Sequence, residues 1–198
     1  MMRLKLKIFS GLTFLMLGIA PCLSWALEPD DGFSLGHKIE THHFTVLIES
    51  GVDDEALIRA LNIGPQDNFL SGQIMAESPY SPDNLGNQLD ILFGWVCSVL
   101  DMKLYSYKGV IKIAHDENAL KQLFHKLYGQ PGFSDKSFFV QEINTIYVAA
   151  PDFTKEILGH EMGHAAMGSY FLVQPPEKVA EVLAGYVEYQ LRKQSAQR

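Results

Sequence analysis

The feature that most restricts the fold of this chain is the pentapeptide His160-Glu161-Met162-Gly163-His164, inside a segment, 153–171, that is predicted to be helical. Residues four positions apart on a helix share one face about one turn apart. The two imidazoles can therefore bind one metal ion at about 2.1 Å each. Glu161 points to a neighbouring side, where a general base would lie near the ion without binding it. The alternative is an ordinary helix with two surface histidines and a solvated glutamate.

A second predicted helix offers a third metal ligand, which a tetrahedral catalytic site needs because two histidines fall short of the usual three protein ligands. Pro175-Pro176 interrupts the chain and leaves Glu177 in the first turn of this helix. One stripe at helical spacing carries the candidate ligands Glu177, Glu181 and Glu188, together with Ala184. The predicted apolar side consists of Val179, Val182, Leu183, Tyr186 and Leu191.

These motifs resemble those of the gluzincins, zinc metallopeptidases of the MA clan. The resemblance rests on the HExxH pentapeptide, on Pro176 five residues before Glu181, and on the segment 181–188, and it is strongest over 145–188. It implies one Zn²⁺ per chain held by His160, His164 and Glu181, with Glu161 as the catalytic general base. Lys178 and Val182 stand where the family usually has tryptophan and glycine, but neither position donates to the metal.

The resemblance implies an exported zinc-dependent metallopeptidase that hydrolyses peptide bonds of a protein or peptide substrate with a zinc-activated water. One alternative is a non-catalytic binding module with a zincin fold, which the intact Glu161 disfavours because a scaffold needs no base. Another is a zinc hydrolase of a different amide, such as a deformylase or an amidase. A deformylase would need a cysteine ligand, and Cys97 lacks the expected glycine-rich strand context.

Three further residues are candidates for supporting roles at such a site. Glu188 could accept the N–H of a metal-binding histidine and so hold its ring. Tyr186, beyond Glu181, and Tyr170, near the end of the HExxH helix, could donate to the developing oxyanion. For both tyrosines, a position in the core or at the rim is the favoured alternative.

The first 26 residues have the features of a cleaved signal peptide. Arg3, Lys5 and Lys7 precede an apolar stretch over 8–20, and Ser24-Trp25-Ala26 provides small residues at the positions that signal peptidase reads. We expect cleavage after Ala26 and a periplasmic or secreted protein. The apolar stretch is short for a membrane anchor. A lipoprotein attached through Cys22 is the weaker alternative, because Pro21 stands where a small residue is required.

Charge and cysteine content limit the partners and the stabilising chemistry. Cleavage after Ala26 removes Arg3, Lys5 and Lys7 and takes the formal net charge from −7 to −10. So acidic a domain has no evident basic surface for binding nucleic acid or anionic lipid. Cleavage also removes Cys22 and leaves Cys97 alone, which excludes an intramolecular disulfide. Cys97 lies in an apolar pattern and is predicted to be a small buried residue.

The predicted organisation is a flexible N-terminal arm over 27–36, rich in acidic residues, proline and glycine, followed by one domain over 37–198. The predicted fold class is α+β and zincin-like, with a small mixed or antiparallel sheet packed on helices. A hairpin formed by 138–140 and 145–149 directly precedes the HExxH helix, which Asp152 or Thr154 can cap. The resemblance implies that this sheet edge holds an extended substrate over the ion.

Other predicted elements follow from hydrophobic spacing and turn residues. A first strand covers 43–49, and its adjacent His42 and His43 are predicted to face opposite ways and not to share an ion. A long loop is predicted over 64–84. The remaining elements are helices at 53–61, 84–102 and 116–128 and a strand at 110–114.

Overall fold

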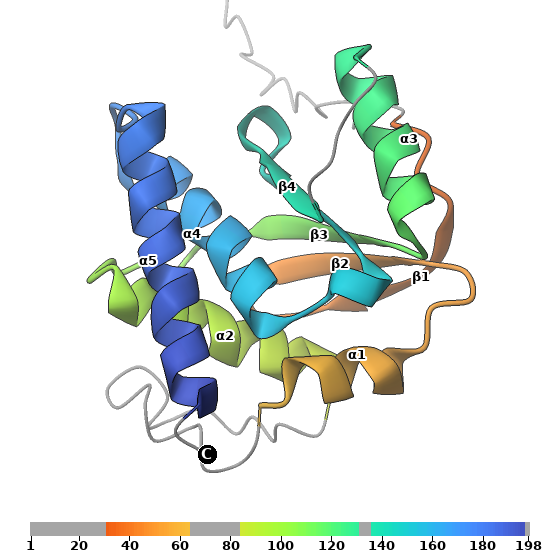
Figure 1. Cartoon of the computed structure of the whole chain (residues 1–198), viewed down its shortest axis with the longest axis horizontal. Helices are drawn as coiled ribbons and strands as arrows, with labels where there is room; N and C mark the ends of the chain where they lie inside the picture. Colours follow the sequence, from red (N-terminus) through yellow and green to blue (C-terminus); the bar gives the residue numbers. More distant parts are fainter. Residues whose placement is uncertain (1–30, 64–83, 131–135, 197–198) are drawn as a thin grey trace, which may run out of the picture.

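The computed structural model describes residues 31–63, 84–130 and 136–196 (Figure 1). Its centre is a five-stranded sheet in the order β1-β2-β3-β5-β4. The strands are β1 (Leu35–Glu40), β2 (Phe44–Glu49), β3 (Gly109–Ala114), β4 (Ser137–Val140) and β5 (Thr145–Ala149). Strands β2, β3 and β5 run parallel, and the edge strands β1 and β4 run antiparallel to their neighbours. The α+β class and the mixed sheet are as predicted.

Helices cover both faces of this sheet (Figure 1). They are α1 (Asp54–Leu61), α2 (Leu85–Val99), α3 (Glu117–Tyr128), α4 (Lys155–Tyr170) and α5 (Glu177–Ala196). The larger hydrophobic cluster joins alternate strand residues such as Ile111 and Ile146 to α1, α2, α4 and α5. On the opposite face, Tyr147 packs in a smaller cluster with residues of α3. Within the described residues, no helix is both long and apolar enough to span a bilayer.

The predicted starts of α1, α2 and α3 are confirmed by their capping contacts, whereas α2 ends at Val99, three residues before the predicted end. Asp53, Asn84 and Asp116 begin α1, α2 and α3, because each side chain accepts a backbone N–H of the first turn. Gly129 ends α3 with a left-handed backbone, φ +67°. Of the two predicted caps for α4, the structure uses Thr154, whose hydroxyl accepts the N–H of Ile157 at 3.3 Å. The hairpin of β4 and β5 is also confirmed.

The predicted flexible arm at 27–36 is wrong for its described residues, 31–36. Asp31 is buried, and β1 begins at Leu35 and pairs with β2, so the predicted first strand is the second. The side chains of β1 are almost all exposed. Because β1 is an edge strand held by backbone hydrogen bonds, its sequence does not alternate between apolar and polar residues. The hydrophobic pattern of the sequence therefore did not predict this strand. The predicted loop at 64–84 lies almost entirely outside the described residues.

The predicted opposite orientation of His42 and His43 is also wrong. The two residues lie in a turn just before β2, and Nδ1 of His42 is 3.2 Å from Nε2 of His43. The buried carboxylate of Asp90 holds this turn by accepting both backbone N–H groups, at 2.8 and 2.9 Å. A turn does not follow the alternation of a strand, so adjacent side chains converge. The predicted position at the end of a strand is correct.

Candidate metal centre

The close packing of α4 and α5 sets the geometry of the candidate site. Gly159 and Gly163, one turn apart on α4, face α5; a Cβ atom on Gly159 would overlap Cδ1 of Leu191, and one on Gly163 would lie 3.4 Å from Cα of Ala184. Since neither glycine carries a side chain, the two helix backbones approach closely at this point. This contact places the first half of α5 beside the histidines of α4.

The predicted apolar side of α5 is therefore only partly right. Leu191 is buried, and Leu183 packs at the edge of the core. Ala184 and Val187 are buried as well, because small residues fit against the glycines of α4. Three residues that were predicted to be on the apolar side, Val179, Val182 and Tyr186, are exposed instead.

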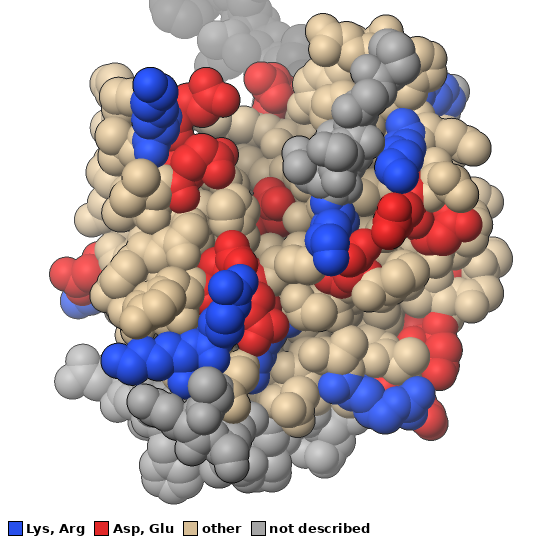
Figure 2. Space-filling model, in the orientation of Figure 1, with Lys and Arg blue, Asp and Glu red and all other residues tan. Residues whose placement is uncertain are grey.

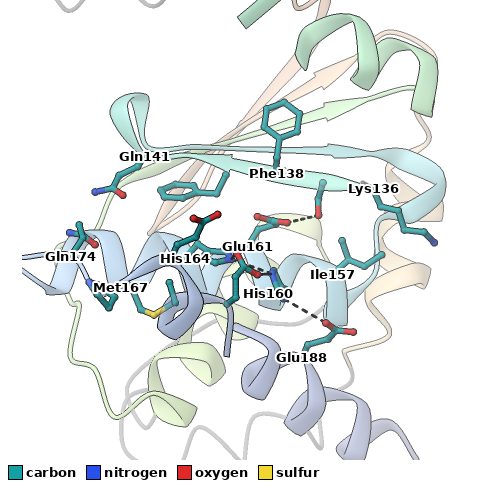
Figure 3. Close-up of a pocket in the computed structure, with 16 residues that line it drawn as sticks. Lys136, Phe138, Gln141, Ile157, His160, Glu161, His164, Met167, Gln174 and Glu188 are labelled. Atoms are coloured by element: carbon teal, nitrogen blue, oxygen red, sulfur yellow. Dashed lines mark hydrogen bonds and ion pairs between the residues drawn. The ribbon is translucent and has the colours of Figure 1, made fainter. Parts of the chain in front are cut away.

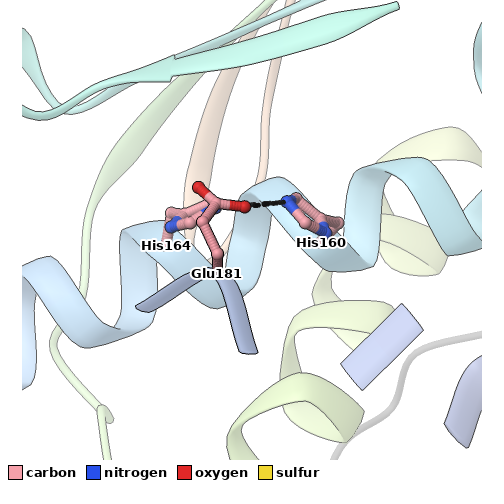
Figure 4. Close-up of side chains that lie close together, drawn as sticks. All are labelled: His160, His164 and Glu181. Atoms are coloured by element: carbon pink, nitrogen blue, oxygen red, sulfur yellow. Dashed lines mark hydrogen bonds and ion pairs between the residues drawn. The ribbon is translucent and has the colours of Figure 1, made fainter. Parts of the chain in front are cut away.

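The structure brings the three predicted metal ligands together (Figure 4). Nε2 of His160 and Nε2 of His164 are 3.2 Å apart. The carboxylate of Glu181 places Oε2 at 3.5 Å from Nε2 of His160 and Oε1 at 3.3 Å from Nε2 of His164. Across the three described ranges, this is the one group of three or more His, Cys, Asp or Glu residues whose ligand atoms all lie within 4.8 Å of one another.

These separations fit a tetrahedral zinc ion. Two ligand atoms bonded at about 2.1 Å and at a tetrahedral angle are roughly 3.4 Å apart, close to all three distances between the donor atoms. Two imidazoles and one carboxylate are also a donor set that zinc accepts, with a fourth position left for water. Burial lowers the pKa of His164, with the nearby His160 acting in the same direction and Glu181 opposing it. A lowered pKa favours the neutral imidazole, which is the form that binds a metal.

Glu161 lies on α4 beside the two histidines and is held by a contact that the sequence did not predict. Its Oε1 accepts a hydrogen bond of 2.7 Å from the hydroxyl of Ser137, the first residue of β4, and both side chains are buried (Figure 3). Glu161 is not within the group of convergent ligand atoms. It therefore has the position expected of a base that lies near the ion without binding it.

Glu188 lies beside His160, but at a separation longer than the hydrogen bond that its predicted supporting role requires. Its Oε2 is 3.6 Å from Nδ1 of His160, the ring nitrogen that faces away from the ligand cluster. Arg192, one turn further along α5, forms an ion pair with the same carboxylate. Arg192 was not among the predicted site residues, although its spacing from Glu188 could have indicated the pair. The carboxylate of Glu188 is therefore an electrostatic neighbour of His160, and the predicted hydrogen bond is not formed in this structure.

The site opens into a cleft of about 830 Å³ between the sheet edge and the two helices (Figure 3). One wall is the edge strand β4 with the residues beside it, including Lys136, Phe138 and Gln141. The floor carries Ile157, His160, Glu161 and His164 of α4, and α5 contributes Glu177, Glu181 and Glu188. Acidic side chains are visible at the cleft in Figure 2. The strand edge therefore runs along the candidate metal centre.

Three other predicted residues lie away from this cleft. Tyr170 and Tyr186 do not line it, and each is about half exposed, so the structure does not support their predicted role as oxyanion donors. Cys97 is a buried free thiol whose pKa burial raises to about 12, which agrees with the predicted structural role. Ser137 lines the cleft and contacts Glu161, but the sequence did not predict it, because no local motif distinguishes this serine.

Comparisons of the chain with models of known protein families, with curated proteins and with solved structures found no match.

Proposed function

We propose that this protein is an exported, zinc-dependent metallopeptidase with a zincin-like fold. The observation that carries the proposal is the convergence of His160, His164 and Glu181 beside Glu161 in an open cleft. A chance pair of surface histidines would not come with a third ligand from another helix at zinc-like separations. An intact carboxylate in the position of a base favours catalysis over a purely structural metal.

In the proposed mechanism, His160, His164 and Glu181 bind one Zn²⁺. The bound ion would lower the pKa of a water molecule and polarise the scissile carbonyl. Glu161 would accept a proton through its carboxylate from the water whose oxygen bonds to the carbonyl carbon, and would deliver that proton to the leaving nitrogen as the C–N bond breaks. Ser137 holds Oε1 of Glu161 and so orients the carboxylate, while the negative charge of Glu188 lies near Nδ1 of His160.

The proposed substrate is a protein or peptide in an extended conformation. Strand β4 forms the edge of the sheet and one wall of the cleft. A peptide that continues the sheet along β4 would pass over the metal centre with its main chain held by hydrogen bonds. The phenyl rings at Phe138 and Phe139 would contact its side chains.

The first experiment is the zinc content of the purified protein after dialysis against buffer without chelator. We expect about one zinc per chain in the wild type, and a large loss in Glu181→Ala because it removes one of the three proposed ligands. Glu177→Ala is the matched control, since this glutamate also lines the cleft on α5 but lies outside the ligand group. Equal zinc content in wild type and Glu181→Ala, or no stoichiometric zinc in the wild type, would contradict the proposed site.

Glu161→Gln separates a peptidase from a non-catalytic zinc-binding module. Because Glu161 does not belong to the ligand group, zinc should stay bound, while hydrolysis of a casein or a mixed peptide library should fall to background. Full hydrolysis by this variant would exclude Glu161 as the base. An active wild type that cleaves only non-peptide amides would favour the alternative of another zinc amide hydrolase.

Export is proposed from the N-terminal sequence, 1–26. N-terminal sequencing of the protein recovered from the periplasm or the medium should begin at Leu27. A chain that retains residues 1–26, or one acylated at Cys22, would show that the leader has a different role.

A further inference from the structure

Helix α5 carries a second apolar face on its outer side. Val179, Val182, Tyr186 and Tyr189 are 46%, 70%, 48% and 58% exposed, and we call these four residues the outer stripe. The opposite side of the same helix, with Ala184, Val187 and Leu191, is fully buried against the rest of the molecule. A helix that is apolar on two opposite sides typically has protein packed against both of them.

The turn that leads into α5 also exposes apolar side chains. Leu172 and Val173 are 105% and 86% exposed, and Tyr170 and Phe171 precede them with partly exposed rings 5.3 Å apart. In Figure 2, an uncharged area lies on the side of the molecule where α5 lies, bordered by charged side chains above and below it. With aromatic areas of about 150–250 Å² each, the outer stripe and the turn expose on the order of 800 Å². The largest apolar patch on a typical monomer is only about 300–600 Å².

The outer stripe has the spacing and the residue sizes of a self-complementary helix pair. Its residues follow intervals of three, four and three, which is the seam of two packed helices. If a second α5 packs antiparallel about a two-fold axis at the level of Ala184, Val182 faces the partner's Tyr186 and Val179 faces the partner's Tyr189. Each pair joins a small and a large side chain, so both layers can interlock.

We propose that the outer stripe is the interface of a two-fold symmetric dimer of this chain. The exposed apolar area matches the roughly 800 Å² per partner of a standard stable interface. In the antiparallel register, Leu172 and Val173 lie toward the C-terminal turn of the partner's α5 and extend the contact. The formal net charge of −7 disfavours an anionic lipid surface as the occupant.

The four residues of the outer stripe do not line the cleft. Glu177, Glu181 and Glu188 line the cleft from a different side of α5 than the outer stripe, which faces away from the buried Ala184. The interface is therefore independent of the proposed peptidase activity, and it can be tested whether or not the protein binds zinc.

The test is the mass of the purified full chain by light scattering over a range of concentrations. We expect a dimer for the wild type and a rise of about 100-fold or more in the dissociation constant for Val182→Glu, which places one carboxylate from each copy in the apolar seam. Tyr105→Glu is the matched control, because Tyr105 is also an exposed apolar residue, at 63%, but lies outside α5. Circular dichroism of both variants checks that they remain folded.

Disulfide crosslinking tests the register without disturbing the charge. In an equimolar mixture of Val182→Cys and Tyr186→Cys chains, oxidation should favour the mixed dimer, whereas Val179→Cys with Val182→Cys should crosslink poorly. Cys97 is buried, and Cys22 is replaced by serine in every chain of this experiment, so that neither native cysteine interferes. The proposal is overturned if the wild type has the mass of one chain at every concentration, if Val182→Glu dimerises as well as the wild type, or if the apolar surface binds phosphatidylcholine vesicles in place of a second chain.

Discussion

Ser137 donates a hydrogen bond of 2.7 Å to Oε1 of Glu161, and both side chains are buried at the end of the cleft nearest the start of β4. The contact joins the edge strand, which would hold the substrate, to the carboxylate that would take the proton. One oxygen of Glu161 is thereby fixed, and the carboxylate plane is set relative to the histidines. Ser137 is thus a positioning residue in the proposed mechanism.

Ser137→Ala should lower kcat by about 10-fold with little change in KM, because it frees the orientation of Glu161 without removing the base. Zinc content should not change, since Ser137 is not a ligand. Ser137→Thr keeps the hydroxyl and should restore most of the rate. Ser195→Ala is the control: it removes a similar Ser-to-Glu hydrogen bond, of 2.8 Å to Glu156, and neither of these two residues lines the cleft. Equal kcat for Ser137→Ala and Ser195→Ala would exclude the positioning role.

Sequence spacing predicted the part of the site that is local. The four-residue interval of His160 and His164 fixes both rings on one helix face, and the resemblance to gluzincins selected Glu181 among three glutamates on α5. The contact of Ser137 with Glu161 joins residues 24 positions apart and depends on how β4 lies beside α4, which no local pattern reports. Similarly, periodicity identified apolar residues on α5, but it could not tell which of two apolar faces meets α4. Gly159 and Gly163 determine which face of α5 packs on α4, because the absence of side chains at these glycines lets the face with Ala184 come close.

The buried cluster of Asp31, Lys112 and Tyr147 ties the N-terminal segment to the sheet. Oδ2 of Asp31 accepts hydrogen bonds from Nζ of Lys112 at 2.7 Å and from the hydroxyl of Tyr147 at 2.5 Å. Asp31→Ala should reduce the free energy of unfolding by about 3–5 kcal/mol, since it leaves the ammonium of Lys112 buried without this partner. In contrast, Glu55→Ala, which breaks the exposed ion pair with Arg59, should cost at most about 0.5 kcal/mol. Urea titrations that give both variants the same stability would contradict the role of Asp31.

The same cluster predicts a loss of stability in acid. Burial acts to raise the pKa of Asp31, but hydrogen bonds from Lys112, Tyr147 and the N–H of Phe33 outweigh it and hold the pKa below 3.8. Because the folded pKa is the lower one, this stabilisation is fully present above the unfolded pKa and disappears as the pH falls through the folded value. The stability difference between wild type and Asp31→Asn should therefore shrink below about pH 4. A difference that stays constant down to pH 2 would show that ionised Asp31 does not contribute.

His115 predicts a pH dependence of the opposite sign. Its Nδ1 is 2.6 Å from Oε2 of the buried Glu49, and this hydrogen bond raises the pKa of His115, with Asp116 acting in the same direction. A raised folded pKa means that the stabilisation is complete below the unfolded pKa of about 6.5 and is lost as the pH rises through the folded value. Thermal unfolding of wild type and His115→Gln should therefore differ more at pH 5.5 than at pH 9. Subtracting the unfolding temperature of His115→Gln from that of the wild type removes the contributions of the other histidines. A difference that grows with pH would refute the stabilising role of protonated His115.

Gly159 and Gly163 occupy equivalent places one turn apart on α4, yet they should respond differently to alanine. Both substitutions gain up to about 1 kcal/mol of helix propensity. In Gly159→Ala, however, the new methyl group overlaps Cδ1 of the fully buried Leu191, and such overpacking costs about 1–3 kcal/mol. In Gly163→Ala, the nearest atom is Cα of Ala184 at 3.4 Å, an ordinary contact.

We therefore expect Gly163→Ala to be neutral or slightly stabilising and Gly159→Ala to lower the unfolding temperature, because Leu191 must repack. Zinc affinity should fall as well to the extent that the repacking shifts α5 with Glu181. Leu191→Ala by itself should destabilise the protein by about 2–5 kcal/mol by leaving a cavity. In the double variant Gly159→Ala/Leu191→Ala, the new methyl group occupies part of that cavity, so the two losses should be less than additive. Strict additivity in a double-mutant cycle would show that these two residues do not set the distance between the helices that carry the proposed zinc ligands.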